Sequence, residues 1–199
     1  MNVKSIYEQA IGARFEQLHP LLKKKYGKQL GTLTATGTMN HIRGSVVYRP
    51  VARIFARDDF LFPERGRNVP FTITNTYHLS PQVVDWERTF YFQKNVRTFF
   101  ARMYWDTSSE QILDRLGRSG RFMQPLAFTV TSNGALLITS EQSFIRLFGR
   151  YVKLPKRMSA KVNVYEEAID DEHIHIFVHI TLIGTVMMYE GVATIVEQK

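Results

Sequence analysis

Apolar and polar side chains alternate regularly along most of this chain, a pattern typical of strands that are buried on one side. From about residue 32 onward, runs rich in Thr, Val, Ile, Tyr and Phe follow one another, and turn residues separate them about every 8–12 positions. Successive side chains of a strand point to opposite faces of a sheet, so these runs indicate antiparallel strands. We predict a mainly β fold, an antiparallel meander of about nine to eleven strands.

Sheets of this size rarely remain flat, because every strand is twisted relative to its neighbour. We expect the meander to curl into a barrel or half-barrel, and the strand pattern leaves open whether the barrel closes. A barrel of more than about eight strands can enclose a small ligand, whereas about eight strands are nearly filled by their own side chains.

Residues 1–27 depart from the strand pattern and predict an N-terminal helix. The dipeptide His19-Pro20 can kink or split this helix, because proline lacks a backbone donor. Apolar residues recur here at helical spacing: Ile6, Ala10, Phe15, Leu18, Leu21 and Leu22. No repeat or linker follows, so we expect a single domain over residues 1–199, with the barrel-like sheet over residues 32–199.

Three hairpins can be tested by parity, because residues that face each other across an antiparallel pair share one face of the sheet. A two-residue Ser80-Pro81 turn pairs Phe71 with Phe90, Ile73 with Arg88, Asn75 with Trp86 and Tyr77 with Val84. A two-residue Lys94-Asn95 turn pairs Phe90 with Phe99, Arg88 with Ala101, Trp86 with Met103 and Val84 with Trp105. A type I′ turn at Asn133-Gly134 pairs Val130 with Leu137.

The first two registers build one apolar face over three strands, and Arg88 lies on it. A guanidinium removed from water needs an acceptor, and its planar fork suits a carboxylate or a phosphate. That acceptor is either the anionic group of a ligand or an internal carboxylate of Asp114, Glu141 or Glu190, unless the side chain reaches solvent at the rim. The candidate ligand-binding residues on this face are Arg88, Trp86, Phe90, Phe71, Asn75, Tyr77, Met103 and Trp105.

Two segments combine bases with apolar residues at helical spacing. The stretch YRPVARIFARDDFLFP predicts a short basic amphipathic helix, and SFIRLFGRYVKLPKR contains no acidic residue. Such segments can dock on anionic lipid, cover a barrel mouth, or cover a sheet edge while their bases point to water. The candidate membrane or partner contacts are Arg49, Arg53, Arg57, Arg146, Arg150 and Lys153.

The stretch HIHIFVHI predicts a strand whose histidines face one way and whose isoleucines face the core. An odd-length acidic loop at residues 170–172 places Glu167 opposite His175 on the preceding strand. Histidines two apart on a strand lie about 7 Å apart, so His173, His175 and Glu167 form a conceivable metal set. We favour a solvated strand face over a metal site, because no orienting group is evident.

Charge and composition narrow the classes of function. Residues 1–157 hold 24 Lys and Arg against 11 Asp and Glu, whereas residues 158–199 hold 2 against 7. A basic body of this kind attracts phosphate, nucleic acid or an anionic bilayer.

The chain contains no cysteine, which excludes disulfides and thiol catalysis. It has no signal-peptide pattern and no apolar run of about 18 residues, so we expect a soluble cytoplasmic protein.

Five segments together resemble an uncharacterised bacterial family of unknown function: LFPERGRNVPFTI, WERTFYF, RMYWD, ILDRLG and GTVMMYEGVATIVE. In some members of that family the same domain follows a saccharopine-dehydrogenase-like domain. The resemblance implies a bacterial, cytoplasm-facing accessory or ligand domain, and it brings no catalytic residue with it.

We predict a non-enzymatic domain that binds a small amphipathic, anionic molecule inside the curled sheet. We expect no catalytic residue and no cofactor, because the sequence contains no motif for phosphate, nucleophilic or metal chemistry. The alternatives are a module that binds an anionic membrane or a dehydrogenase-like partner through its basic segments, and an enzyme that uses the His and Glu strand. Nucleic acid is not favoured, because no binding motif occurs. A cavity above about 300 Å³ favours the ligand, and a filled interior favours the surface module.

Overall fold

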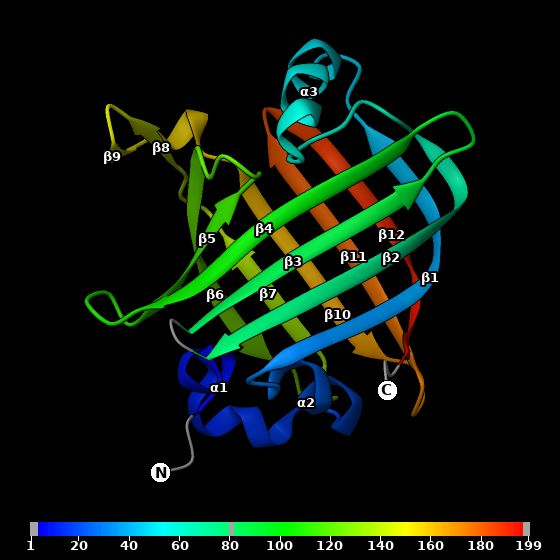
Figure 1. Ribbon diagram of the computed structural model, residues 1–199, viewed down its shortest axis with the longest axis vertical. Helices are drawn as coiled ribbons and strands as arrows, with labels where there is room; N and C mark the ends of the chain where they lie inside the picture. The colour runs from blue at the N-terminus through cyan, green and yellow to red at the C-terminus, as the bar shows by residue number, and fades with distance from the viewer. Residues whose placement is uncertain (1–3, 80–81, 197–199) are drawn as a thin grey trace.

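The computed structural model describes residues 4–79 and 82–196, and twelve strands among these residues form one antiparallel sheet. The strands are β1 (Gly31–Gly44), β2 (Gly66–Leu79), β3 (Gln82–Tyr91), β4 (Val96–Asp106), β5 (Gln111–Leu116), β6 (Phe122–Val130), β7 (Leu136–Ser140), β8 (Phe144–Leu147), β9 (Arg150–Lys153), β10 (Lys161–Ala168), β11 (His173–Leu182) and β12 (Gly184–Val196). Ten of them close into the barrel seen in Figure 1.

Strand neighbours in the barrel follow chain order from β1 to β7 and from β10 to β12, and β7 pairs with β10. The hairpin of β8 and β9 leaves the barrel and is joined to it through β6. Pairing of β12 with β1 completes the ring. The predicted mainly β, curled antiparallel meander is therefore confirmed, and the barrel closes.

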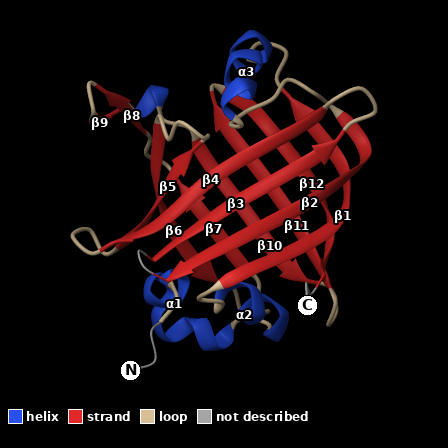
Figure 2. Ribbon diagram, viewed as in Figure 1, coloured by secondary structure: helices blue, strands red, loops and turns tan. Residues whose placement is uncertain are grey.

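Helices cover both ends of the barrel (Figure 2). At one end lie α1 (Ile6–Ile11), η1 (Gly12–Gln17) and α2 (Pro20–Tyr26), at the other end α3 (Arg49–Phe55) and η2 (Ala56–Asp58), and η3 (Lys156–Met158) follows β9. The predicted N-terminal helix is confirmed, in three pieces. Gly12, with φ of 64°, ends the first piece, and Pro20 begins the third, where the His19 ring accepts a hydrogen bond from the Leu21 amide.

Two of the predicted registers are confirmed. In the β2–β3 pair Arg88 lies opposite Ile73, and in the β10–β11 pair Glu167 lies opposite His175. The predicted Ser80-Pro81 turn lies outside the described residues.

The predicted β3–β4 register is wrong by two residues, because Arg88 faces Phe99 and Trp86 faces Ala101. A longer connection replaces the predicted Lys94-Asn95 turn, and in it Phe92 leaves the ladder to pack on Phe62, with ring centroids 5.7 Å apart. The side-chain period of a strand is two, so an even shift leaves every residue on its predicted face.

The predicted β6–β7 register is wrong by one residue, because Val130 faces Leu136 rather than Leu137. The Thr131 backbone amide donates to the Ala135 carbonyl, and the Thr131 hydroxyl accepts from the Ala135 amide. These bonds close a loop around Asn133-Gly134 that is longer than the predicted two-residue turn.

The β1–β12 seam depends on close backbone approach. A Cβ at Gly37 would overlap the carbonyl oxygen of Val192, and a Cβ at Gly191 would lie 2.6 Å from the Met39 Cα. The register also shifts between Met39 and His41, and such a bulge bends a strand. Glycine at these two positions lets the first and last strands meet.

Candidate ligand site inside the barrel

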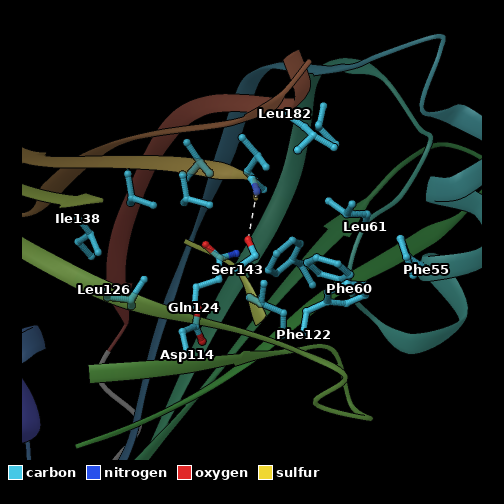
Figure 3. Close-up of a pocket in the computed structure, with 18 of the residues that line it drawn as sticks. Phe55, Phe60, Leu61, Asp114, Phe122, Gln124, Leu126, Ile138, Ser143 and Leu182 are labelled. Carbon is cyan, nitrogen blue, oxygen red and sulfur yellow. Dashed lines mark hydrogen bonds between the residues drawn. The ribbon is translucent and has the colours of Figure 1, made fainter. Parts of the chain in front are cut away.

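A cavity of about 170 Å³ lies inside the barrel. Its lining is mostly apolar, and Figure 3 shows aromatic side chains of Phe55, Phe60 and Phe122 on one side. Val51, Met158 and Leu182 line the cavity and are also exposed to solvent. The cavity therefore opens at the end that carries α3, between α3, η3 and the β11–β12 turn.

The N-terminal helices fill the opposite half of the interior. Tyr7, Leu22 and Tyr26 are completely buried there, and the Trp86 indole donates a hydrogen bond of 2.8 Å to the Tyr7 hydroxyl. The cavity is consequently smaller than the roughly 300 Å³ expected above to favour an internal ligand, and at about 170 Å³ the interior is not filled either. An apolar cavity of about 150 Å³ nevertheless holds one benzene ring, so the space suits a small head group or a slender chain.

Arg88 lies on the cavity wall and is only 6% exposed. Its guanidinium sits over the rings of Trp86 and Phe99, 4.7 and 5.4 Å from their centroids. Across residues 4–79 and 82–196, no hydrogen bond or ion pair engages this guanidinium. Cation–π contacts therefore hold the side chain in place, while its N–H donors remain available to a molecule in the cavity.

Two buried polar side chains face the same space. Asp114 of β5 and Gln124 of β6 are cross-strand neighbours and line the cavity, as Figure 3 shows. The Oδ1 atom of Asp114 and the Oε1 atom of Gln124 have no hydrogen-bond partner among the described residues. Burial raises the pKa of Asp114 to about 7, and the charge of Arg88 offsets only part of that rise. The cavity thus contains a cation and two unsatisfied acceptors within an apolar wall.

The internal carboxylates predicted as partners of Arg88 do not pair with it in the described structure. The charge of Arg88 lowers the pKa of Asp114, but the two side chains form no ion pair. Glu190 lies on the outer face, 3.1 Å from the His175 ring, and the exposed Glu141 lies 3.7 Å from Lys161. The predicted rim position is wrong as well, because the side chain is buried.

The eight predicted ligand-site residues divide into two groups. Arg88, Trp86 and Met103 line the cavity. The other five lie outside its lining: Phe90, Phe71, Asn75 and Tyr77 are buried, and Trp105 is partly buried against the core. Tyr77 shows the reason, since its hydroxyl donates to the Lys25 carbonyl at 2.7 Å and is thereby covered by α2. Parity identified the inward face correctly, but it carries no information about how far the end helices enter the barrel.

Comparison with known proteins identifies the family. Residues 18–192 match the model of the family described as "Domain of unknown function (DUF4166)". The chain belongs to this family. It is also 34% identical to the "Uncharacterized protein YndH" of Bacillus subtilis (strain 168) over 199 residues, which covers 95% of this chain and 96% of the relative. The predicted bacterial family is thus confirmed, and association with a dehydrogenase-like domain stays a prediction.

A buried ion pair beneath the cavity was missed by sequence reasoning. Lys25 of α2 and Glu166 of β10 are both within the core, and the Lys25 Nζ atom lies 2.7 and 2.6 Å from the two carboxylate oxygens. Burial lowers the pKa of Lys25, and Glu166 counters that effect. Two signals were available: Lys25 continues the helical spacing of Leu18 and Leu22, and Glu166 continues the inward alternation of Val164.

The histidine strand has ordinary polar partners on the outside of the barrel. The His173 ring lies 2.8 Å from a carboxylate oxygen of Asp170, and Glu167 accepts a 2.6 Å hydrogen bond from Asn133. Within the part of the chain that the structure describes, no three His, Asp or Glu side chains converge to hold a metal ion. The strand faces follow the prediction, because Ile174 is buried and His173 is partly exposed.

The two basic segments lie at the open end of the barrel. The first forms α3, as predicted, but the second is a β-hairpin and a short 3-10 turn rather than a helix. Phe148 and Gly149 both have positive φ, which is the geometry of a two-residue hairpin turn. The six predicted contacts, Arg49, Arg53, Arg57, Arg146, Arg150 and Lys153, are all exposed. No helix among the described residues is both long and apolar enough to cross a bilayer.

Proposed function

We propose that the barrel is a non-enzymatic binding domain for a small amphipathic, anionic molecule. The anionic group accepts hydrogen bonds from the Arg88 guanidinium, and the apolar part extends along the cavity toward α3. One observation carries the proposal: this guanidinium is buried at the cavity wall without an acceptor among the described residues. A buried charge left in that condition costs several kcal/mol, so an anionic ligand stabilises the site by supplying the acceptor.

Asp114 and Gln124 refine the chemistry of the head group. A pKa of about 7 leaves much of the Asp114 population protonated at neutral pH. A protonated carboxyl group donates one hydrogen bond, so Asp114 and Arg88 together can bind the oxygens of a carboxylate or phosphate. The amide group of Gln124 supplies a further donor beside them. Arg88 alone favours an anion, and these neighbours make the site specific for a compact acidic group.

The size of the cavity limits the apolar part. About 170 Å³ accommodates the head group and a short length of chain, and a longer chain has to leave through the mouth beside α3. A slender single-chain or single-ring molecule therefore fits, whereas a bulky one does not.

Binding of straight-chain carboxylates tests the proposal. Native mass spectrometry and calorimetry compare carboxylates of increasing length with the matching neutral alcohols, on the wild type, on Arg88→Leu and on Arg67→Leu. Arg67 is an exposed arginine outside the cavity lining, so it controls for loss of charge. The measurements are made at about pH 6, where Asp114 is mostly protonated. Removing the Arg88 charge then leaves no unpaired carboxylate in the core, so the variant should stay folded.

The wild type and Arg67→Leu should bind carboxylates more tightly than alcohols, and Arg88→Leu should lose that preference while remaining folded. A bidentate charged contact of this kind is worth about 1.5–3 kcal/mol, or roughly 10- to 100-fold in affinity. Equal carboxylate binding by Arg88→Leu, or no binding of any amphiphile by the wild type, overturns the proposal.

A further inference from the structure

Exposed apolar side chains surround the mouth of the cavity. Val47 is 81% and Ile183 is 80% exposed, although both are large aliphatic residues. They belong to a larger set at the α3 end of the barrel, here called the mouth surface: Val46, Val47, Val51, Ile54, Leu182, Ile183 and Met158, with Leu147, Phe148 and Val152 on the β8–β9 hairpin. Figure 1 shows α3 and this hairpin at the same end of the molecule.

Bases lie among these apolar residues. Arg49, Arg53 and Arg57 project from α3 and η2, and the hairpin region adds Arg146, Arg150, Lys153, Lys156 and Arg157, all of them exposed. Among the described residues, no ion pair joins any of these bases to a carboxylate. The mouth surface therefore combines positive charge with exposed aliphatic area.

Carboxylates near this end are already engaged by other residues. The contacts are Asp58 with Ser119, Asp59 and Glu87 with Arg118, Glu64 with Arg97, and Glu141 with Lys161. The eight exposed bases of the mouth surface outnumber these five carboxylates, so this end of the barrel keeps a net positive charge.

Two sets of contacts fix α3 over the mouth. The Tyr48 hydroxyl accepts a 3.1 Å hydrogen bond from the Ile183 amide and lies 3.2 Å from the Ile183 carbonyl oxygen, to which it donates. Phe55 packs against Phe60 and Phe122, with centroids 5.4 and 5.3 Å apart. Because α3 and the β11–β12 turn are held together in this way, their exposed side chains form one preformed surface.

We infer that the mouth surface docks on the surface of an anionic lipid bilayer. Bases bind the lipid phosphates, while the aliphatic side chains enter the boundary between head groups and acyl chains. Lipid fits better than nucleic acid, because the exposed apolar residues are nearly all aliphatic, and single-stranded nucleic acid requires aromatic platforms for stacking. Charge complementarity and exposed aliphatic area together favour this partner.

Docking in this orientation places the cavity opening against the lipid. If the proposed ligand is a lipid-derived acid, it can then pass between bilayer and barrel without crossing water. The docking inference itself rests on the mouth surface alone, and it stands if the cavity binds nothing.

Vesicle flotation tests the inference, with vesicles of phosphatidylcholine alone and of phosphatidylcholine mixed with phosphatidylglycerol. The charge variant is Arg49→Gln, Arg53→Gln and Arg57→Gln combined. Its matched control, Lys4→Gln with Arg14→Gln and Lys28→Gln, removes as many charges from the end that carries the N-terminal helices. The apolar variant is Val47→Ser with Ile54→Ser, and its control is Leu30→Ser with Ile169→Ser, which are also exposed.

The wild type should bind the anionic vesicles only, and raising the salt concentration from about 0.1 to 0.5 M should release it. Each base near such a surface strengthens binding about five-fold, so the charge variant should bind roughly 100-fold more weakly. The apolar variant should lose about tenfold, and both controls should bind as the wild type does.

Binding that ignores lipid charge, or an equal loss in the matched controls, overturns the inference. So does tight binding to duplex DNA or RNA without binding to vesicles. Arg88→Leu separates the two proposals: it should still float with anionic vesicles even though it no longer prefers carboxylates.

Discussion

The Lys25 ammonium and the Glu166 carboxylate form an ion pair in the core, and only 3% and 1% of these residues are exposed. Lys25 comes from α2 and Glu166 from β10, so the pair attaches the N-terminal helices to the barrel wall. The Lys25 Nζ atom also lies 4.6 Å from the centroid of the Trp86 ring, and the guanidinium of Arg88 lies 4.7 Å from that ring. Trp86 thereby connects the ion pair to the cavity.

Replacing Lys25 by Met should lower the free energy of unfolding by about 3–5 kcal/mol, because it leaves the Glu166 carboxylate buried without a partner. The double variant Lys25→Met with Glu166→Met should be less destabilised than Lys25→Met alone. Lys23→Met is the control, since Lys23 pairs with the exposed Glu16 at 2.8 Å, and it should cost under about 1 kcal/mol. Urea denaturation measures the stability of all three variants. A double variant less stable than Lys25→Met alone would contradict the prediction.

Asp114 should make the stability of the ligand-free protein fall as pH rises. Its folded-state pKa of about 7 lies above the unfolded value, so between about pH 4 and 7 the folded state holds a proton that the unfolded state has lost. The free energy of unfolding is therefore highest below the pKa of the unfolded state. It declines as the pH rises toward the pKa of the folded state and levels off above it. Between about pH 5 and pH 8 the free energy of unfolding of the wild type should fall by about 3 kcal/mol more than that of Asp114→Asn. Urea denaturation at each pH measures both values. Parallel curves for the two proteins would refute this.

The affinity for an anionic ligand should fall above about pH 7. A ligand anion beside Arg88 and an ionised Asp114 leaves two negative charges for one positive charge, so binding requires Asp114 to take up a proton. Above the Asp114 pKa of about 7, affinity for a carboxylate should drop about tenfold per pH unit. Calorimetry across this range should show the drop in the wild type and a flat profile in Asp114→Asn. A flat wild-type profile would exclude the coupling.

Closure of the barrel should be sensitive to one methyl group at Gly37. In Gly37→Ala the new Cβ meets the Val192 carbonyl oxygen and lies 2.8 Å from the Ala193 Cα, so the seam has to shift. We expect a loss of roughly 1–3 kcal/mol in unfolding free energy. Gly44→Ala, on the same strand, is the control, because its Cβ would have no neighbour closer than 3.9 Å. Similar midpoints for the two variants in urea denaturation would show that the seam is not tightly packed.

Residue patterns were sufficient for much of the architecture. Alternation predicted the strands of the barrel but not the β8–β9 hairpin, and parity placed Arg88 on the inward face even though the β3–β4 register was wrong by two. The register itself could not be derived from parity, because the packing of Phe92 on Phe62, a residue of another segment, lengthens the turn. The candidate site was predicted only in part: its cation and two of its lining residues were identified, while Gln124 was not.

Sequence alternation was enough to show which residues of a strand share a face, since side chains alternate with a period of two whatever the strand pairs with. It did not assign the inward face of every strand, because in β7 the predicted register put Leu137 opposite Val130, where the structure has the buried Leu136. Barrel closure, the cavity and the pairing of buried charges depend instead on contacts between segments that are far apart in the chain. Closure depends on backbone contact between β1 and β12, from opposite ends of the chain, and the cavity volume depends on how far α1 and α2 enter the barrel. Whether a buried charge is paired, as Lys25 is, or left facing a cavity, as Arg88 is, depends on distant segments whose packing no local pattern specifies.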